Sequence, residues 1–276
     1  INPYTGEITG IDDGKGFFMK IMRLHRWLLD EYKRDGSFAW GKTIVGYSTL
    51  VLAIIIISGL VIWYPRNRKA LKNRFKIRTK AGWFRFLYDL HVSGGFYAAL
   101  LLLILALTGL TWSFGWYRDA FYTAFGISTT SKQTHAPTSA VPQKTAGERG
   151  SKKHPKTDYT QWSEVLADLQ SRYPEYKSIS IQDGSATVST AAYGNTRGSD
   201  RYSFDPATGK ITEIQLYKDL PKSAKIRGWI YSVHAGTWGG LTTRILSCLV
   251  SLLGAVFAIT GYYFWIKKKL RKSKQR

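Results

Sequence analysis

Three histidines lie beside long apolar segments of the chain, and their imidazoles could bind a metal ion or a haem iron. His25 belongs to an amphipathic stretch before the first apolar segment, His91 directly precedes the second, and His234 precedes the third. Ionisable residues at membrane helices cost free energy and tend to be functional, and imidazole is a common metal ligand. We therefore interpret these histidines as ligands; the alternative is that each hydrogen-bonds to lipid headgroups or caps a helix.

The surrounding residues favour haem over other metal centres. A structural zinc site needs a cluster of cysteines or carboxylates with the histidines, and the sequence has none. It also has no Cys-x-x-Cys-His motif, which covalent attachment of haem requires. A bis-histidine haem b needs one imidazole from each of two helices and an apolar slot. Nearby glycines could admit a flat ring, although helix packing explains them equally well. They are Gly94, Gly95, Gly236, Gly239 and Gly240.

Three apolar segments, 44–64, 92–116 and 241–266, must position these histidines. Each has about 20 apolar residues, which as a helix cover roughly the 30 Å of a bilayer's hydrocarbon core. A buried helix of a soluble protein would carry a polar face. The segments are therefore predicted to be transmembrane helices. The amphipathic residues 16–34, which precede them, are predicted to form an interfacial helix.

The distribution of basic residues predicts the orientation. The formal net charge is +22, and much of the excess lies in loop 65–91, with nine basic residues and one acid, and in tail 267–276, with seven basic residues. By the positive-inside rule, the loop and the C-terminal tail are cytoplasmic. Because the basic surplus flanks membrane spans, the expected partner is a lipid bilayer and no nucleic acid is expected.

Residues 117–241 are then predicted to lie outside, and they contain two kinds of segment. Residues 127–158 are rich in Ser, Thr, Pro, Gly and Lys, which predicts a flexible linker. Residues 159–222 are expected to form a small α+β domain, with one amphipathic helix followed by four strands and a hairpin turn at “DPATGK”. The predicted fold class is a membrane α-helical bundle with such an outer domain.

An internal repeat links the beginning of the chain to this domain. The opening “NPYTGEITGI” resembles “FDPATGKITEI”, and the first and third spans end alike in “SGLVIW” and “TGYYFW”. Residues 1–15 are therefore expected to be the end of a first outer domain. By the length of the complete repeat, we expect roughly a hundred further residues upstream, with a fourth span and a histidine equivalent to His91.

The predicted depths pair the histidines. His25 and His234 are both predicted on the outer side and are expected to share one haem. His91 is predicted on the inner side, and its partner at a second haem is expected to be the upstream histidine. Two haems would then carry electrons across the membrane. Basic residues near the outer pair could bind haem propionates, although snorkelling to headgroups explains them as well. They are Arg23, Arg26 and Arg244.

Motifs over nearly the whole chain carry a family resemblance. They are “NPYTGEITG”, “LHRWLL”, “ISGLVIW”, “LHVSGGFYAALLLLILALTGLTWSF” and “VHAGTWGG” followed by “ITGYYFW”. Together they resemble the PepSY-associated transmembrane family of bacterial inner-membrane proteins. The resemblance implies four spans, periplasmic PepSY-type domains and haem-binding reductases that reduce ferric siderophores in the periplasm and release Fe(II). His25, His91 and His234 match the family's histidine positions, and this chain departs from the family by lacking the first span.

The resulting hypothesis is a di-haem inner-membrane reductase that passes electrons from an unidentified cytoplasmic donor to a ferric siderophore. No nucleophile, paired carboxylates or phosphate loop indicates hydrolysis or group transfer, so no catalytic residue is assigned. One alternative is a non-enzymatic PepSY membrane anchor that binds a peptide or regulates a protease. The other is a transporter, because repeats suit alternating access, although the spans contain no acidic residue.

Overall fold

The computed structural model describes residues 15–30, 38–65, 71, 74–127, 159–190 and 194–273. Most of segment 1–15 and of linker 127–158 lies outside these residues, so the predictions made for them are not addressed. The chain divides into two compact units. The first comprises Ile1–Arg118 and Cys248–Arg276, and the second comprises Asp119–Ser247.

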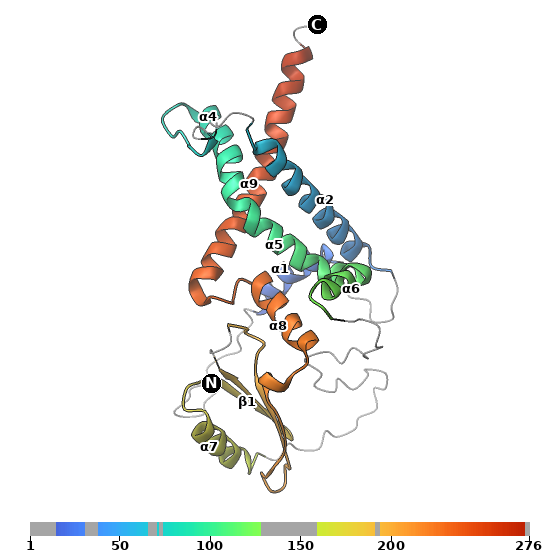
Figure 1. Cartoon of the computed structure of the whole chain (residues 1–276), viewed down its shortest axis with the longest axis vertical. Helices are drawn as coiled ribbons and strands as arrows, with labels where there is room; N and C mark the ends of the chain where they lie inside the picture. Colours follow the sequence, from blue (N-terminus) through green and yellow to red (C-terminus); the bar gives the residue numbers. More distant parts are fainter. Residues whose placement is uncertain are drawn as a thin grey trace. The chain divides into compact units, whose positions relative to one another are not determined.

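Helices make up the first unit. They are α1 (Lys15–Trp27), α2 (Trp40–Trp63), α4 (Trp83–Asp89), η1 (Leu90–Gly94), α5 (Gly95–Ser113), the beginning of α6 (Gly115–Ala124) and most of α9 (Gly240–Ser273). The three helices α4, η1 and α5 follow one another without a break (Figure 1).

Three helices in the described part of the chain are long and apolar enough to cross a membrane, namely Trp40–Trp63, Trp83–Ser113 and Gly240–Arg271. Their large apolar side chains are mostly exposed; Ile62, for example, is 76% exposed. Such a surface is unfavourable in water and suits a bilayer. The predicted class, a helical membrane protein, is confirmed.

The boundaries of two spans differ from the predicted ones. The second helix begins at Trp83 rather than at residue 92, because an ion pair between Arg85 and Asp89 one turn later supports helix where the basic loop was expected. The third continues beyond residue 266 to Ser273, through lysines that favour helix and can keep their charged ends in water.

Small residues and aromatic rings form the contacts between these helices. A Cβ at Gly46 would meet the Phe114 ring at 2.9 Å, so α2 approaches the end of α5 closely because this position is glycine. Near the other end of α2, Trp63 stacks on Phe96 with ring centroids 3.9 Å apart. A leucine of α5 packs against Gly254 of α9. These contacts fix the helices that carry the candidate site.

Helix α1, in the region predicted to be helical from 16 to 34, ends at Trp27. Leu28 and Leu29 have φ angles of 51° and 67°, a left-handed conformation that stops an α-helix. Asp30 then accepts a hydrogen bond from the backbone N–H of Gly41 at 3.1 Å. The carboxylate therefore satisfies a free donor in the first turn of α2 and ties the two helices together.

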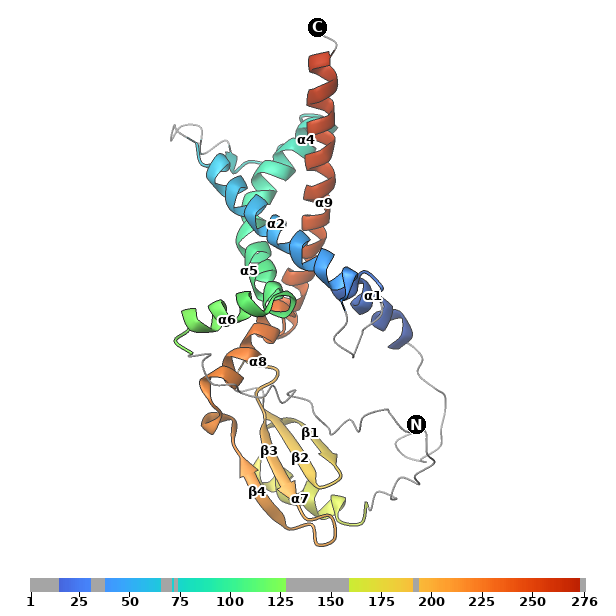
Figure 2. The ribbon, with the colours of Figure 1, turned by 90° about the vertical axis from the view of Figure 1, so that its right-hand side faces the viewer.

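The second unit contains a small α+β domain. The elements of the second unit are the end of α6, α7 (Trp162–Arg172), β1 (Tyr176–Gln182), β2 (Ser185–Thr190), β3 (Asp200–Phe204), β4 (Ile211–Gln215), η3 (Tyr217–Asp219), α8 (Lys222–His234) and the beginning of α9. The strands form an antiparallel sheet in the order β1-β2-β3-β4. Figure 2 shows α7 against one face of this sheet. The predicted α+β domain is confirmed.

Apolar residues of α7 and of the facing strands make the core of this domain. They are Val165, Leu169, Ala186, Val188, Tyr202 and Phe204. At the edge of the core, the Tyr173 hydroxyl donates to the Asp200 carboxylate at 2.7 Å and lies 2.6 Å from the Tyr202 hydroxyl. Burial and the bond to Asp200 raise the pKa of Tyr173, so the phenol stays protonated as a donor.

The predicted hairpin turn joins β3 to β4. Asp205 accepts hydrogen bonds from the backbone N–H of Ala207 at 3.0 Å and from the Thr208 hydroxyl at 2.9 Å. Gly209 has a φ of 66°, which a residue with a side chain rarely adopts. The carboxylate, the hydroxyl and the glycine together explain why this short sequence reverses the chain.

This turn should respond to acid. The hydrogen bonds from Ala207 and Thr208 lower the pKa of Asp205. A lowered pKa stabilises the turn above the ordinary aspartate pKa, and that stabilisation is lost as the pH falls through the lower folded pKa. We expect the protection factor of the Ala207 amide hydrogen, its exchange rate corrected for the intrinsic rate at each pH, to fall only below about pH 4. Asp205→Asn should remove this pH step, and a step that persists in that variant would contradict the assignment.

Candidate functional site

His91 lies in η1, a turn of π-helix within the otherwise α-helical segment Trp83–Ser113. Single π-turns inside α-helices are uncommon and often occur at functional sites. The sequence analysis placed His91 before the helix, whereas the structure places it within the span, where its half-buried ring faces α9. The π-turn therefore marks His91 as a candidate ligand in a site between two helices.

The ring of His91 is oriented by a hydroxyl of α9. His91 Nδ1 lies 2.8 Å from the Thr260 Oγ1, and Thr260 Oγ1 lies 2.8 Å from the Val256 carbonyl oxygen. A threonine hydroxyl has one proton, and the carbonyl can only accept. The arrangement that satisfies both contacts has Thr260 donating to Val256 and Nδ1–H of His91 donating to Thr260. This tautomer leaves Nε2 with its lone pair.

One face of α9 forms a slot around the imidazole. The rings of Phe257 and Phe264 meet it nearly edge to face, with centroids 5.9 and 5.8 Å away. Between them, a Cβ at Gly261 would lie 3.4 Å from Cε1 of His91. Phe257, Thr260, Gly261 and Phe264 are spaced so that they share one side of a helix. The slot holds the ring by apolar contacts and one hydrogen bond, and the sequence analysis did not predict it.

The residues at His91 fit a haem ligand. A metal-ligating histidine usually donates its other ring N–H to an oxygen, which fixes the ring and its tautomer. His91 does so through Thr260, and its surroundings are mainly apolar, as haem requires. The two glycines after His91 differ: Gly94 packs against Leu90 and Phe257, whereas a Cβ at Gly95 would meet nothing within 4 Å. Gly94 thus serves helix packing, and Gly95 leaves space open.

A buried carboxylate anchors the helix just before His91. Asp89 forms an ion pair with Arg85 at 3.0 Å and accepts a hydrogen bond from the backbone N–H of Arg78 at 3.2 Å. One turn after Asp89, the Ser93 hydroxyl donates to the carbonyl of Arg74 at 2.6 Å. The segment from Arg74 to Arg78 is therefore held against both sides of the π-turn.

Replacing Asp89 by alanine should loosen this anchor. We expect the free energy of unfolding to fall by about 1–3 kcal/mol, because a buried ion pair and a hydrogen bond are lost while Arg85 is partly exposed and can turn to water. Asp89→Asn keeps an acceptor for the Arg78 N–H and should cost about half as much. Thermal unfolding of the detergent-solubilised protein measures both. Equal stability of all three proteins would show that Asp89 anchors nothing.

His234 is the last residue of α8, a helix that the sequence analysis did not predict. The helix ends in a Schellman motif: the N–H of Thr237 bonds to the carbonyl of Ser232 at 2.8 Å, and Gly236 has a φ of 65°. Gly240 likewise has a φ of 72°. These glycines thus reverse the chain between α8 and α9, so their presence beside His234 does not require a bound ring.

His25 lies on the exposed surface of α1. It belongs to the first unit and His234 to the second, so their pairing on one haem stays a prediction. The basic residues proposed to bind propionates have local contacts: Arg23 donates to the carbonyl of Leu29 at 3.3 Å, and Arg26 lies 4.6 Å from the ring centroid of Trp27. Their role toward a haem also stays a prediction, as does that of exposed Arg244.

No three His, Cys, Asp or Glu side chains gather into a metal-binding group within the parts of the chain that the structure describes. A bis-histidine haem takes one imidazole from each of two helices and does not need such a group.

Three membrane-spanning helices and a small antiparallel sheet domain define the protein as a helical membrane protein with an α+β domain. A model of the PepSY-associated TM region matches residues 1–268, and the chain belongs to this PepSY_TM family. The family resemblance stated from the motifs is thereby confirmed. A search of the curated proteins found no match.

Proposed function

We propose that this protein is a haem-dependent oxidoreductase that carries electrons across the bacterial inner membrane and reduces ferric siderophores in the periplasm. The observation that supports this most is the geometry at His91. Its Nδ1 is hydrogen-bonded to Thr260, the tautomer that satisfies this bond leaves a lone pair on Nε2, and the ring lies between apolar helices long enough to span a membrane. A histidine held in this way matches the requirements of an axial haem ligand.

The protein's own residues bind and orient the cofactor in this proposal. Haem b, when bound, supplies the one-electron chemistry. His91 would provide an axial ligand for one haem, and Thr260 would fix the tautomer and plane of its ring. His25 and His234 are the proposed ligands of a second haem nearer the other face. Arg23, Arg26 and Arg244 would bind propionates there.

The charge distribution supports the direction of transfer. Basic residues are frequent around 65–85 and after Ile266. By the positive-inside rule, His91 would then lie toward the cytoplasm and the sheet domain in the periplasm. In this proposal electrons would come from a cytoplasmic donor on the side of the membrane where His91 would hold a haem. They would leave at the opposite face to a ferric siderophore, and the weaker binding of Fe(II) by hard oxygen chelators would release the iron.

A vesicle assay tests this function. The purified protein is loaded with haem and inserted into vesicles that contain dithionite, and a ferric siderophore that carries free carboxylates is supplied outside with a ferrous-specific dye. We expect dye-bound Fe(II) to form only in vesicles that contain the protein. Vesicles with the His91→Ala variant, at equal protein content, are the control. Fe(II) formation at the rate of protein-free vesicles would refute reductase activity.

A further inference from the structure

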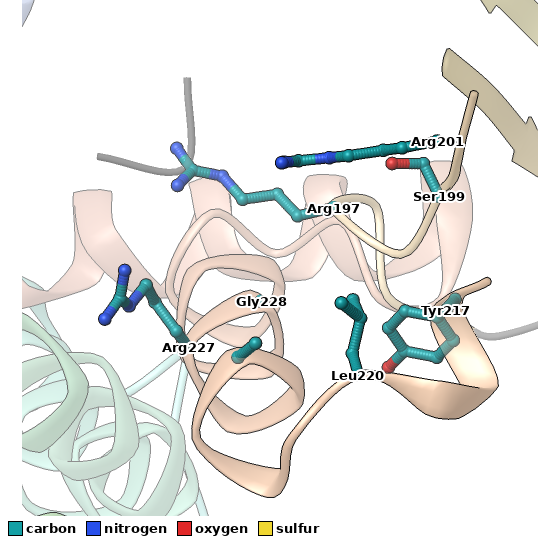
Figure 3. A pocket seen from close by; sticks show the side chains of 8 residues that line it. Arg197, Ser199, Arg201, Tyr217, Leu220, Arg227 and Gly228 are labelled. Atoms are coloured by element: carbon teal, nitrogen blue, oxygen red, sulfur yellow. The ribbon is translucent and has the colours of Figure 1, made fainter. Parts of the chain in front are cut away.

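The second unit carries a positively charged hollow that the electron-transfer proposal does not use. Three arginines from three elements line it: Arg197 from the loop before β3, Arg201 from β3 and Arg227 from α8 (Figure 3). Tyr217 and Ser199 contribute hydroxyl-bearing side chains to the lining. No acidic residue lines the hollow.

The wall of the hollow is held by buried hydrogen bonds. Asn195, which is 3% exposed, donates to the Tyr217 hydroxyl at 3.1 Å and accepts from the Ser232 hydroxyl at 3.1 Å. The same amide oxygen accepts from the backbone N–H of Arg197 at 3.0 Å. A Cβ at Gly228 would collide with the Asn195 amide, so α8 packs directly on this loop. The backbone that presents Arg197 is therefore fixed.

The arginine side chains are also oriented. The guanidinium carbon of Arg197 lies 3.7 Å from the ring centroid of Tyr231, a cation–π contact that restricts its position. Figure 3 shows Arg201 extending toward Arg197 across the upper side of the hollow. Both arginine side chains therefore lie along a wall that has no carboxylate.

The nearest acid in sequence does not neutralise them. Asp200 precedes Arg201, but its carboxylate accepts hydrogen bonds from the Tyr173 hydroxyl at 2.7 Å and from the backbone N–H of Tyr217 at 2.6 Å. Within the described residues, neither Arg197 nor Arg201 forms an ion pair. Like charges that converge without a counter-charge favour binding of an anion, and the planar guanidinium fork matches carboxylate and phosphate oxygens.

We propose that this hollow binds the acidic groups of a negatively charged ferric chelate, with Arg197 and Arg201 as the main contacts. The proposal rests on the proposed reductase function and specifies its substrate class: chelates with free carboxylate or comparable anionic oxygens rather than uncharged ones. The phosphate of a lipid headgroup has the same chemistry, so the experiment must separate the two sources.

The test measures binding without any electron transfer. Ferric citrate is titrated calorimetrically into the oxidised protein in an uncharged detergent, with an uncharged ferric trihydroxamate as the second probe. The double variant Arg197→Gln/Arg201→Gln is compared with Lys177→Gln/Lys210→Gln, which removes the same charge from exposed positions of the same domain outside the hollow. We expect Kd for ferric citrate to rise at least tenfold in the arginine variant and less than twofold in the lysine variant.

Two results would overturn the proposal. Equal weakening by both double variants would mean general electrostatic attraction, and unchanged binding in the arginine variant would mean that citrate binds elsewhere. A third arm uses nanodiscs: if phosphatidylglycerol, but not phosphatidylcholine, displaces ferric citrate only when the arginines are present, the hollow is a headgroup site and the chelate assignment fails. Binding that persists in a protein unable to reduce the chelate would refute the reductase function alone.

Discussion

Replacing His91 by alanine is expected to remove about one equivalent of haem per chain and to stop electron transfer across the membrane. The ring lies in a slot on α9 formed by Phe257 and Phe264 and is hydrogen-bonded to Thr260, and alanine at this position has no group that can bind iron. Haem content is measured as pyridine haemochrome against protein concentration, and transfer by the vesicle assay.

A matched variant separates loss of the ligand from loss of the fold. His135→Ala changes a histidine far from any span in sequence and should leave haem content and transfer unchanged. Thermal unfolding of the haem-free proteins should show His91→Ala folded and only modestly less stable than the unsubstituted protein, because it loses one hydrogen bond and the edge-to-face contacts of a half-buried ring. Full haem content in a folded His91→Ala variant would show that His91 is not a ligand.

Thr260→Val is expected to keep the haem but to raise its reduction potential. The hydroxyl accepts Nδ1–H of His91 at 2.8 Å, and this bond makes the imidazole a stronger donor to ferric iron. Without this hydrogen bond, the ferrous form becomes more stable relative to the ferric form. The midpoint potential should therefore rise by roughly 30–60 mV, a three- to tenfold change in the reduction equilibrium. A spectroelectrochemical titration of the purified protein gives the value.

Two comparisons make the Thr260 result specific. Thr260→Ser keeps the hydroxyl and should restore the original potential. Thr49→Val removes a hydroxyl that donates only to the Val45 carbonyl, one turn earlier on α2, so it should leave the potential unchanged. A potential that shifts equally in the Thr49 and Thr260 valine variants would mean that the hydrogen bond to His91 has no special influence.

The sequence predicted the spans because twenty apolar residues in succession have few other uses, and it predicted the hairpin because Asp205, Thr208 and Gly209 act within one turn. It did not predict the π-turn at His91, since the irregularity depends on the packing of loop 74–78 and α9 against the helix. The spans and the hairpin are determined by local sequence patterns, whereas the π-turn is determined by contacts between residues distant in sequence.

The His91 slot illustrates this limit. Ser58–Gly59 and Thr260–Gly261 are alike as parts of the sequence repeat. Nothing in either pair shows that His91, 169 residues before Thr260, forms a hydrogen bond with that threonine. In the structure the two pairs differ, because a Cβ at Gly261 would touch His91 whereas one at Gly59 would meet nothing within 4 Å. The arginine hollow was missed for the same reason, as its residues come from a loop, a strand and a helix.

The absorption spectrum of the purified, membrane-extracted protein, recorded oxidised and then reduced with dithionite, tests the central proposal most directly. A bis-histidine haem b protein should show a Soret band that sharpens and shifts on reduction, together with distinct α and β bands. A folded protein without Soret and α bands after growth with sufficient haem would contradict the proposal and favour a non-enzymatic membrane anchor.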